Sequence, residues 1–200
     1  MIRGQDADSA APTTKAARWP WWLALVLCLA GLALSILLEH LHFKLHLDPT
    51  FHSFCAIDRK VNCDIVARSP YAVLWGVPVA AWGIFGYVLA GVVSLWGARS
   101  RRPLLAAGCG LYLALFFVSG SAVLGAVSAF LVSAVCILCL GTYAVNLLFL
   151  CCLLWVGRGL GLRKVLAEPL RTLRARTARS LATLAVIGGC AATVMAAHPS

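Results

Sequence analysis

The chain has 200 residues, of which 62% are hydrophobic and only 12% are charged, and its mean hydropathy is +0.90. Soluble domains carry about a quarter charged and about half apolar residues, so this composition excludes a water-soluble enzyme, a disordered chain and a small disulfide-stabilised domain. It is typical of an integral membrane protein with several helices. The formal net charge of +10 would suggest nucleic-acid binding in a soluble protein; here the positions of the charges have to be considered first.

Several apolar segments are long enough to be transmembrane helices, each of which needs about 20 mostly apolar residues. Residues 19–38 and 71–97 form two of them, and residues 181–197 form a shorter one. Residues 103–157 contain no charged side chain and are too long for one span, so we expect two helices joined by a turn near residues 131–134. Open sheets cannot cross a bilayer, because their backbone groups would be unpaired. The sequence therefore predicts an all-α polytopic membrane protein, with a four-helix transmembrane bundle plus a fifth transmembrane helix.

The second apolar run is interrupted by Gly76-Val77-Pro78. Proline suits the first turn of a helix, so the membrane helix is expected to begin near Pro78, and residues 71–75 are expected to lie flat or re-enter on the outside.

Lys and Arg residues accumulate on the cytoplasmic side of membrane proteins. Thirteen of the 17 lie before the first span, between the second and third, or between the fourth and fifth, and only four lie in residues 39–70. This distribution predicts a cytoplasmic N-terminus and an outer loop over residues 39–70. It also accounts for the net charge, so no nucleic-acid partner is expected, whereas the basic stretch after the fourth span suits anionic membrane lipid.

The predicted organisation has four parts. Residues 1–17 form a disordered cytoplasmic tail, residues 18–157 the bundle, residues 158–180 a basic cytoplasmic linker, and residues 181–200 the fifth transmembrane helix. The first span is interpreted as a retained anchor, because signal-peptide cores have only about 7–15 apolar residues.

Nine cysteines carry most of the chemical information. Five lie inside apolar runs, where buried thiols behave as small hydrophobic side chains: Cys28, Cys109, Cys151, Cys152 and Cys190. The other four form two pairs on the outer side, Cys136-Ile137-Leu138-Cys139 at the start of the fourth span and Cys55 with Cys63 in the outer loop. An oxidising compartment permits a structural disulfide between Cys55 and Cys63; the alternative is a mobile pair that relays electrons.

Cys136 and Cys139 suit disulfide chemistry. With Ser133 as the helix N-cap, Cys136 would occupy the third helical position, where free N–H groups and the helix dipole stabilise a thiolate. The spacing of three places both sulfur atoms on one face of the helix. Tyr143 and Asn146 continue this stripe into the membrane, where they would hydrogen-bond either a quinone or the neighbouring helices.

Taken together, Cys55-x7-Cys63-Asp64, Ser69, Gly76-Val77-Pro78 and the Cys136–Cys139 pair with Tyr143 resemble the vitamin K epoxide reductase family, most closely its bacterial branch, over residues 19–157. The resemblance implies a four-helix bundle around a quinone of the ubiquinone or menaquinone type.

By the same resemblance, Cys55 would exchange with a partner protein's dithiol, Cys63 would attack Cys136, and Cys139 would deliver electrons to the quinone. Ser69 and Tyr143 would line the quinone pocket, with Asn146 as a further candidate.

The implied function is that of a quinone reductase in the inner (plasma) membrane that generates protein disulfides, with its active site facing the periplasm or exterior. It would reoxidise a thioredoxin-fold, DsbA-like partner, which many bacterial relatives carry fused after the last helix. This chain ends at Ser200, so the partner is expected to be a separate protein, or the chain a fragment. The animal enzymes have an Asn on the second helix; residues 71–97 contain none, which favours quinone over epoxide as the substrate.

Three alternatives remain open. Four histidines precede Cys55 and would suit a metal-binding membrane protein: His40, His42, His46 and His52. Against it, the spans lack the charged residues that translocation pathways usually need, and no metal is expected at the cysteines. A scaffold without redox activity would tolerate the loss of Cys139. A quinone-linked oxidase of the DsbB type would place both cysteine pairs in outer loops.

Overall fold

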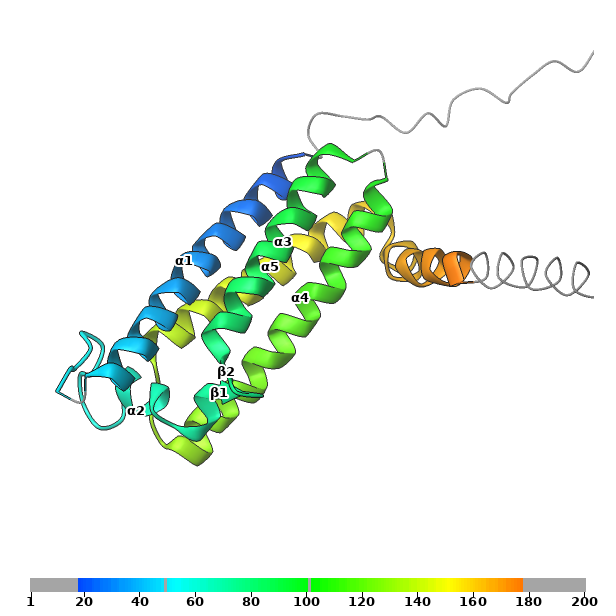
Figure 1. Ribbon diagram of the computed structural model, residues 1–200. Helices are drawn as coiled ribbons and strands as arrows, with labels where there is room; N and C mark the ends of the chain where they lie inside the picture. The colour runs from blue at the N-terminus through cyan, green and yellow to red at the C-terminus, as the bar shows by residue number, and fades with distance from the viewer. Residues whose placement is uncertain (1–17, 49, 101, 178–200) are drawn as a thin grey trace, which may run out of the picture.

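The computed structural model describes residues 18–48, 50–100 and 102–177, and the structural statements below concern these residues. Four long helices lie side by side (Figure 1): α1 (Trp19–Leu47), α3 (Val79–Arg99), α4 (Pro103–Ala126) and α5 (Ile137–Leu160). Helices α1 and α4 each pack against both α3 and α5, so the four helices close into a bundle. Each is long and apolar enough to cross a membrane, which confirms the predicted four-helix membrane bundle. The predicted tail over residues 1–17 and the predicted fifth span lie outside the described residues.

Small side chains fill the centre of the bundle. Ala24, Ala90 and Ala114 are completely buried, and such residues allow helix backbones to approach closely where there is no water to drive association. Large apolar side chains such as Phe85 and Phe116 are exposed on the outside. Large apolar side chains such as Phe149 and Leu111 are also buried, so apolar residues lie both inside and outside the bundle, which suits helices surrounded by lipid.

Helix α1 extends well beyond the predicted end of the first span. It continues from residue 38 to Leu47, so the outer loop begins at Asp48 and not at residue 39. At 1.5 Å per residue a helix of 29 residues is about 43 Å long, more than the roughly 30 Å hydrocarbon layer. The apolar run ends at residue 38, whereas the backbone hydrogen bonds of the helix continue to Leu47.

The segment before α3 folds into a small hairpin that the all-α prediction did not include. After the 3₁₀ turn η2 (Pro70–Ala72), strand β1 (Val73–Leu74) pairs antiparallel with β2 (Val77–Pro78). Trp75 and Gly76, the two residues between the strands, both have positive φ, 53° and 78°, as a two-residue hairpin of type I′ requires. Pro78 caps α3, which confirms the predicted start of this helix.

The turn between α4 and α5 lies where the sequence predicts it, but its details differ. A π-helical segment, η3 (Val127–Val132), ends at Ser133, whose φ of 56° is left-handed. Ser133 therefore closes the preceding helix and is not the N-cap of α5; that prediction was wrong. Cys136 is the N-cap, and α5 begins at Ile137.

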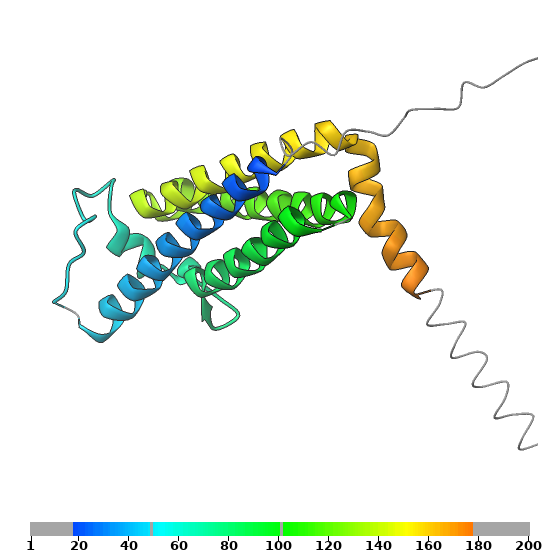
Figure 2. The ribbon, with the colours of Figure 1, turned by 90° about the horizontal axis from the view of Figure 1, so that it is seen from above.

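After α5, residues 162–177 form a further helix that leaves the bundle at the end opposite the outer loop (Figure 2). Its start is anchored to α4, where Val165 is buried and the Tyr112 hydroxyl donates to the carbonyl of Leu166 at 3.0 Å. The predicted basic linker is thus helical over these residues.

One glycine contact tests the packing of α1 against α3. A Cβ at Gly31 would lie 2.2 Å from the Tyr87 ring, whereas one at Gly91 would meet α1 at an ordinary 3.8 Å. We expect Gly31→Ala to destabilise the protein by about 1–3 kcal/mol, because the buried Tyr87 has to move. The control Gly91→Ala should be neutral or slightly stabilising. Thermal unfolding in detergent measures both, and equal melting temperatures would contradict the close packing.

Candidate functional site

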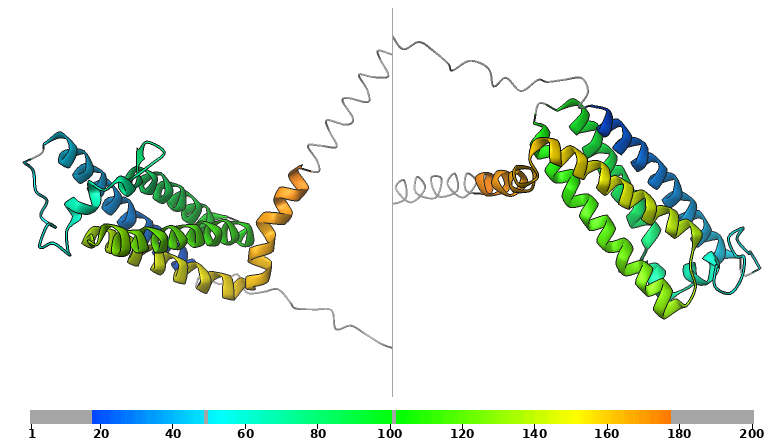
Figure 3. Two further views of the ribbon diagram at one scale, coloured as in Figure 1. Left: turned by 90° about the horizontal axis from the view of Figure 1, so that it is seen from below. Right: turned by 180° about the vertical axis from the view of Figure 1, so that it is seen from behind.

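The two cysteine pairs meet at one end of the bundle. The outer loop lies over the end of α1 and the turn from α4 to α5, as Figure 3 shows from two further directions. The loop contains the short helix α2 (Cys63–Ala67). Cys55, Cys63 and Cys136 belong to one buried apolar cluster there, and each is only 2% exposed.

A tight turn brings Cys55 and Cys63 together. The side chain of Asp58 accepts hydrogen bonds from the backbone N–H groups of Lys60 and Val61, at 2.6 and 2.7 Å, and such side-chain bonds reverse the chain. The Cα atoms of Cys55 and Cys63 lie 5.6 Å apart and their sulfur atoms form a disulfide, at a separation typical of that bond.

Backbone pairing then places the loop beside the Cys136–Cys139 pair. Asn62 N–H donates to the carbonyl of Val135 at 3.0 Å, and Val135 N–H donates to the carbonyl of Lys60 at 2.7 Å. These bonds flank Cys63 on one segment and Cys136 on the other. The two sulfur atoms lie 3.2 Å apart, although 73 residues separate them along the chain. A thiolate at either position is therefore placed to attack the other sulfur.

Cys136 occupies an environment that favours its thiolate. As the N-cap of α5, its sulfur accepts the backbone N–H of Cys139 at 3.4 Å. The hydrogen bond from the Cys139 thiol, with those from the backbone N–H groups of Cys139 and Leu138, lowers the pKa of Cys136, although burial and the nearby Asp64 oppose this. These bonds act at the N-cap of α5 and not at the third helical position that the sequence predicts for Cys136; the catalytic role of Cys136 stays a prediction.

Cys139 faces an apolar environment. It packs against the buried sulfur cluster together with Leu34 and Leu38 of α1. Tyr143, one turn further along α5 on the same face, has its ring against Gly125 of α4. Its hydroxyl makes no hydrogen bond to any residue that the structure describes. An apolar wall with an available phenol suits a quinone ring and its carbonyl oxygen.

The other two predicted quinone contacts are engaged within the protein. The hydroxyl of Ser69 donates to the carbonyl of Val66 at 2.7 Å and so closes the end of α2. Asn146 accepts from the Tyr87 hydroxyl at 2.7 Å and donates to Ser121 at 2.8 Å. This is the arrangement expected if Asn146 pairs with neighbouring helices; its contact with quinone stays a prediction, as does that of Ser69.

The sequence predicts no role for Ser53, and none for Asp64 beyond its place in the motif. Both are buried, at 7% exposure. Asp64 accepts hydrogen bonds from the hydroxyl and the backbone N–H of Ser53, and the Ser53 hydroxyl lies 3.3 Å from the sulfur of Cys55. The available signal was a carboxylate directly after Cys63 in a chain with few charges.

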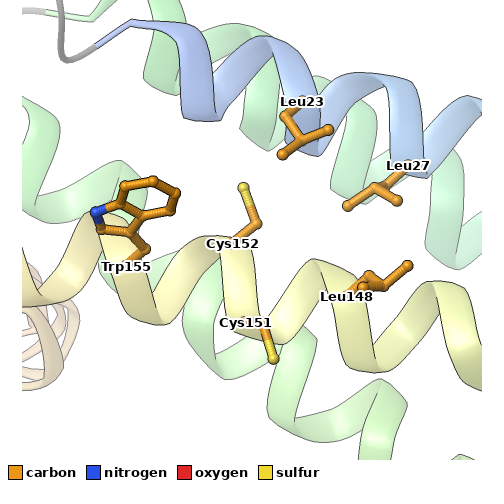
Figure 4. Close-up of a pocket in the computed structure, with 6 residues that line it drawn as sticks. All are labelled: Leu23, Leu27, Leu148, Cys151, Cys152 and Trp155. Carbon is orange, nitrogen blue, oxygen red and sulfur yellow. The ribbon is translucent and has the colours of Figure 1, made fainter.

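Two further observations concern metal binding and a pocket elsewhere in the bundle. Among the described residues, no group of three or more His, Cys, Asp and Glu side chains could hold a metal ion. A pocket of about 240 Å³ lies between α1 and α5 (Figure 4), lined by Leu23, Leu27, Leu148, Cys151, Cys152 and Trp155. Along α1, Leu27 is about 21 Å from Leu41, which belongs to the sulfur cluster. This pocket is therefore distant from the cysteine pairs.

The contact between the two pairs predicts a specific cross-link. In the double variant Cys55→Ala/Cys139→Ala, mild oxidation should join Cys63 to Cys136, because their sulfur atoms are already in contact and no other partner from the two pairs remains. Peptide mass spectrometry under non-reducing conditions detects the bond. The converse variant Cys63→Ala/Cys139→Ala is the control and should cross-link more slowly. Faster cross-linking of Cys55 would contradict the geometry.

The hydrogen bond from Cys139 predicts a pH effect. Because this bond lowers the pKa of Cys136, the thiolate persists to lower pH than that of an ordinary thiol. Cys139→Ala should shift the pH dependence of Cys136 alkylation upward by about one unit, which corresponds to about 1.4 kcal/mol. Site-resolved mass spectrometry measures the rates, with Cys109 as the internal reference. An unchanged profile would show that the Cys139 thiol does not stabilise the Cys136 thiolate.

Comparison with known proteins agrees with this geometry. The family model described as "Vitamin K epoxide reductase family" matches residues 13–154. The chain is similar to "Vitamin K epoxide reductase complex subunit 1" of Mus musculus, with 29% identity over 138 residues, which cover 64% of this chain and 85% of the mouse protein. Four membrane helices, a disulfide-bonded cysteine pair and a family match over most of the chain lead to one conclusion: this chain is a multi-pass membrane protein that belongs to the vitamin K epoxide reductase family of oxidoreductases.

Proposed function

We propose that this chain is a quinone-dependent thiol–disulfide oxidoreductase that reoxidises a thioredoxin-fold, DsbA-like partner and so supports disulfide formation. The single observation that carries the proposal is the 3.2 Å contact between the sulfur atoms of Cys63 and Cys136. A purely structural loop disulfide needs no such contact with a second cysteine pair, whereas an electron relay cannot operate without it.

The relay is a series of thiolate attacks on disulfides. The partner's thiolate attacks Cys55, and Cys63 leaves as a thiolate. The partner's second thiol then resolves the mixed disulfide, which oxidises the partner and leaves Cys55 reduced. Cys63 next attacks the sulfur of Cys136 in a Cys136–Cys139 disulfide, and Cys139 leaves as a thiolate. Attack by Cys55 on Cys63 restores the loop disulfide and frees Cys136, so two electrons now reside on Cys136 and Cys139.

The cysteine pairing seen in the structure is consistent with that last state and so supports the proposal. The Cys55–Cys63 pair is oxidised, and Cys136 and Cys139 are thiols. A quinone bound beside Cys139 would accept two electrons and two protons and leave as quinol into the bilayer. Tyr143 would orient its carbonyl oxygen, and Ser69 and Asn146 are the further candidate contacts. We place the site on the periplasmic or outer face of the inner (plasma) membrane, on the basis of the Lys and Arg distribution.

Reduction of vitamin K epoxide is the second candidate, because the mouse relative carries that activity in its name. The absence of asparagine from α3 (Val79–Arg99) counts against it by the same family resemblance. Supplying the epoxide with a dithiol reductant separates the two candidates.

Quinone absorbance over time tests the proposal. Purified protein with reduced thioredoxin-fold donor should consume a soluble quinone, and Cys139→Ala should lower the rate at least about 100-fold, because the donor thiol is lost. The matched control is Cys151→Ala, since Cys151 is an exposed thiol on the same helix and should leave the rate unchanged. In Cys63→Ala, Cys55 should retain the partner as a mixed disulfide on non-reducing gels. Turnover that survives in Cys139→Ala would refute the relay.

A further inference from the structure

The buried loop around Cys55 contains a chain of hydrogen-bonding groups that ends at an exposed histidine. The sulfur of Cys55 contacts the Ser53 hydroxyl at 3.3 Å, and that hydroxyl is hydrogen-bonded to Asp64. The His52 Nδ1 lies 3.6 Å from the other carboxylate oxygen of Asp64, with its side chain 80% exposed. We propose that Ser53 and Asp64 form a proton relay that takes the proton from the Cys55 thiol and activates it for attack on Cys63.

Burial makes such a relay necessary. A thiol has to lose its proton to become a nucleophile, and Cys55 is only 2% exposed, so water cannot reach it readily. Among the described residues, the Ser53 hydroxyl is the hydrogen-bonding partner of its sulfur atom. In the reduced protein, the Cys55 proton therefore has Ser53 as its acceptor.

The direction of the hydrogen bonds follows from the donors available. An ionised carboxylate only accepts, and Asp64 accepts from both the backbone N–H and the hydroxyl of Ser53. The hydroxyl proton of Ser53 thus points to Asp64, and a lone pair on its oxygen remains for the S–H of Cys55. Asn62, the N-cap of α2, receives the backbone N–H of Asp64 at 3.0 Å and fixes the position of this carboxylate.

The proposed step balances without any added reactant. Cys55 gives its proton to the Ser53 oxygen while Ser53 gives its own hydroxyl proton to Asp64. The Cys55 thiolate then attacks Cys63 in the Cys63–Cys136 disulfide. The Cys55–Cys63 bond forms, the Cys63–Cys136 bond breaks, and its electron pair leaves on Cys136. Ser53 touches the reacting sulfur, and Asp64 acts through Ser53.

The proton then has a route to solvent. It passes from Asp64 to His52, whose side chain is exposed to solvent and whose imidazole can accept a proton. The other titratable groups that the structure places near this network are Cys63, which is in the disulfide, and Cys136, which is sensitive to the charge of Asp64. This relay deepens the proposed function and rests on it for the identity of the reacting pair, but its chemistry can be tested without quinone or partner.

The test measures the reactivity of Cys55 alone. In full-length protein carrying Cys63→Ala, Cys55 is reduced and then reacted with a small aromatic disulfide. The reaction is followed from about pH 6 to about pH 9, a range that spans the pKa of an ordinary thiol. Mass spectrometry quantifies the adduct at residue 55. Added Ser53→Ala should slow the reaction on the order of 100-fold near pH 6, and the deficit should shrink as hydroxide replaces the relay.

The Asp64→Asn variant distinguishes a proton acceptor from a simple negative charge by whether the reaction of Cys55 becomes slower or faster. If Asp64 acted only through its negative charge, its removal would favour the Cys55 thiolate and speed the reaction, whereas loss of a proton acceptor slows it at low pH. Ser94→Ala is the matched control, because Ser94 is a buried serine whose hydroxyl lies 3.9 Å from another cysteine, Cys28; it should change nothing at Cys55.

Three results would overturn the relay. They are an equal deficit at all pH values, which indicates a structural role; no deficit in Ser53→Ala; and faster reaction in Asp64→Asn. Each leaves the electron relay intact, which quinone turnover tests separately. Conversely, the protein could show the expected pH-dependent deficit in Ser53→Ala and still never reduce quinone. That result would refute the proposed function and not the proton relay.

Discussion

The chemistry of this protein depends on two backbone hydrogen bonds at Val135. They pair the residue before Cys136 with Lys60 and Asn62 of the outer loop and, together with the apolar packing around the cysteines, hold Cys63 beside Cys136. The loop disulfide alone would leave Cys55 and Cys63 free to move together relative to Cys136. The pairing also determines where α5 begins, because Val135 has to be extended and the helix cannot start before Cys136. One short bridge thus positions the loop, caps the helix and brings two sulfur atoms into contact.

The membrane bundle supplies a fixed base for that bridge. Its helices pack through small residues, and Tyr87, Asn146 and Ser121 link three of them by hydrogen bonds. The outer loop, in contrast, is held by turns, caps, long-range hydrogen bonds and the apolar cluster around Cys55, Cys63 and Cys136. Because Cys55 is buried, the loop has to open locally before a partner protein can reach its sulfur atom in the proposed reaction. A rigid helix bundle on one side of the cysteines and a loop that can open on the other suit the proposed function, in which a lipid-soluble quinone and a protein partner react in turn.

Much of this arrangement was predictable, for identifiable reasons. Apolar run length predicts the four helices because hydrocarbon thickness sets their minimum length, and it fails at the end of α1 because a helix does not stop where the lipid does. Pro78 marks the start of α3 because proline restricts the backbone. The N-cap of α5 was misplaced because Ser133 has the right chemistry for a cap, whereas the pairing of Val135 with the loop is tertiary and leaves no local pattern. Ser53 has no signal at all in sequence, since its role comes from two neighbours that only the fold supplies.

In the proposed mechanism, electrons and protons leave the loop cysteines in opposite directions. The sulfur contacts lead from the loop to Cys139, which packs against the same apolar cluster as Leu34 and Leu38. In such surroundings charge is costly and an uncharged carrier is favoured. The carboxylate and imidazole of Asp64 and His52 lie on the loop side, where a proton can reach water. Thiol–disulfide exchange moves electron pairs between sulfur atoms, whereas protons need hydrogen-bonded oxygen or nitrogen. The two proposed routes are therefore separated by the chemistry of the side chains. Sulfur atoms lead from the loop toward the membrane bundle, whereas the hydrogen-bonding oxygen and nitrogen atoms of Asp64 and His52 lead toward solvent.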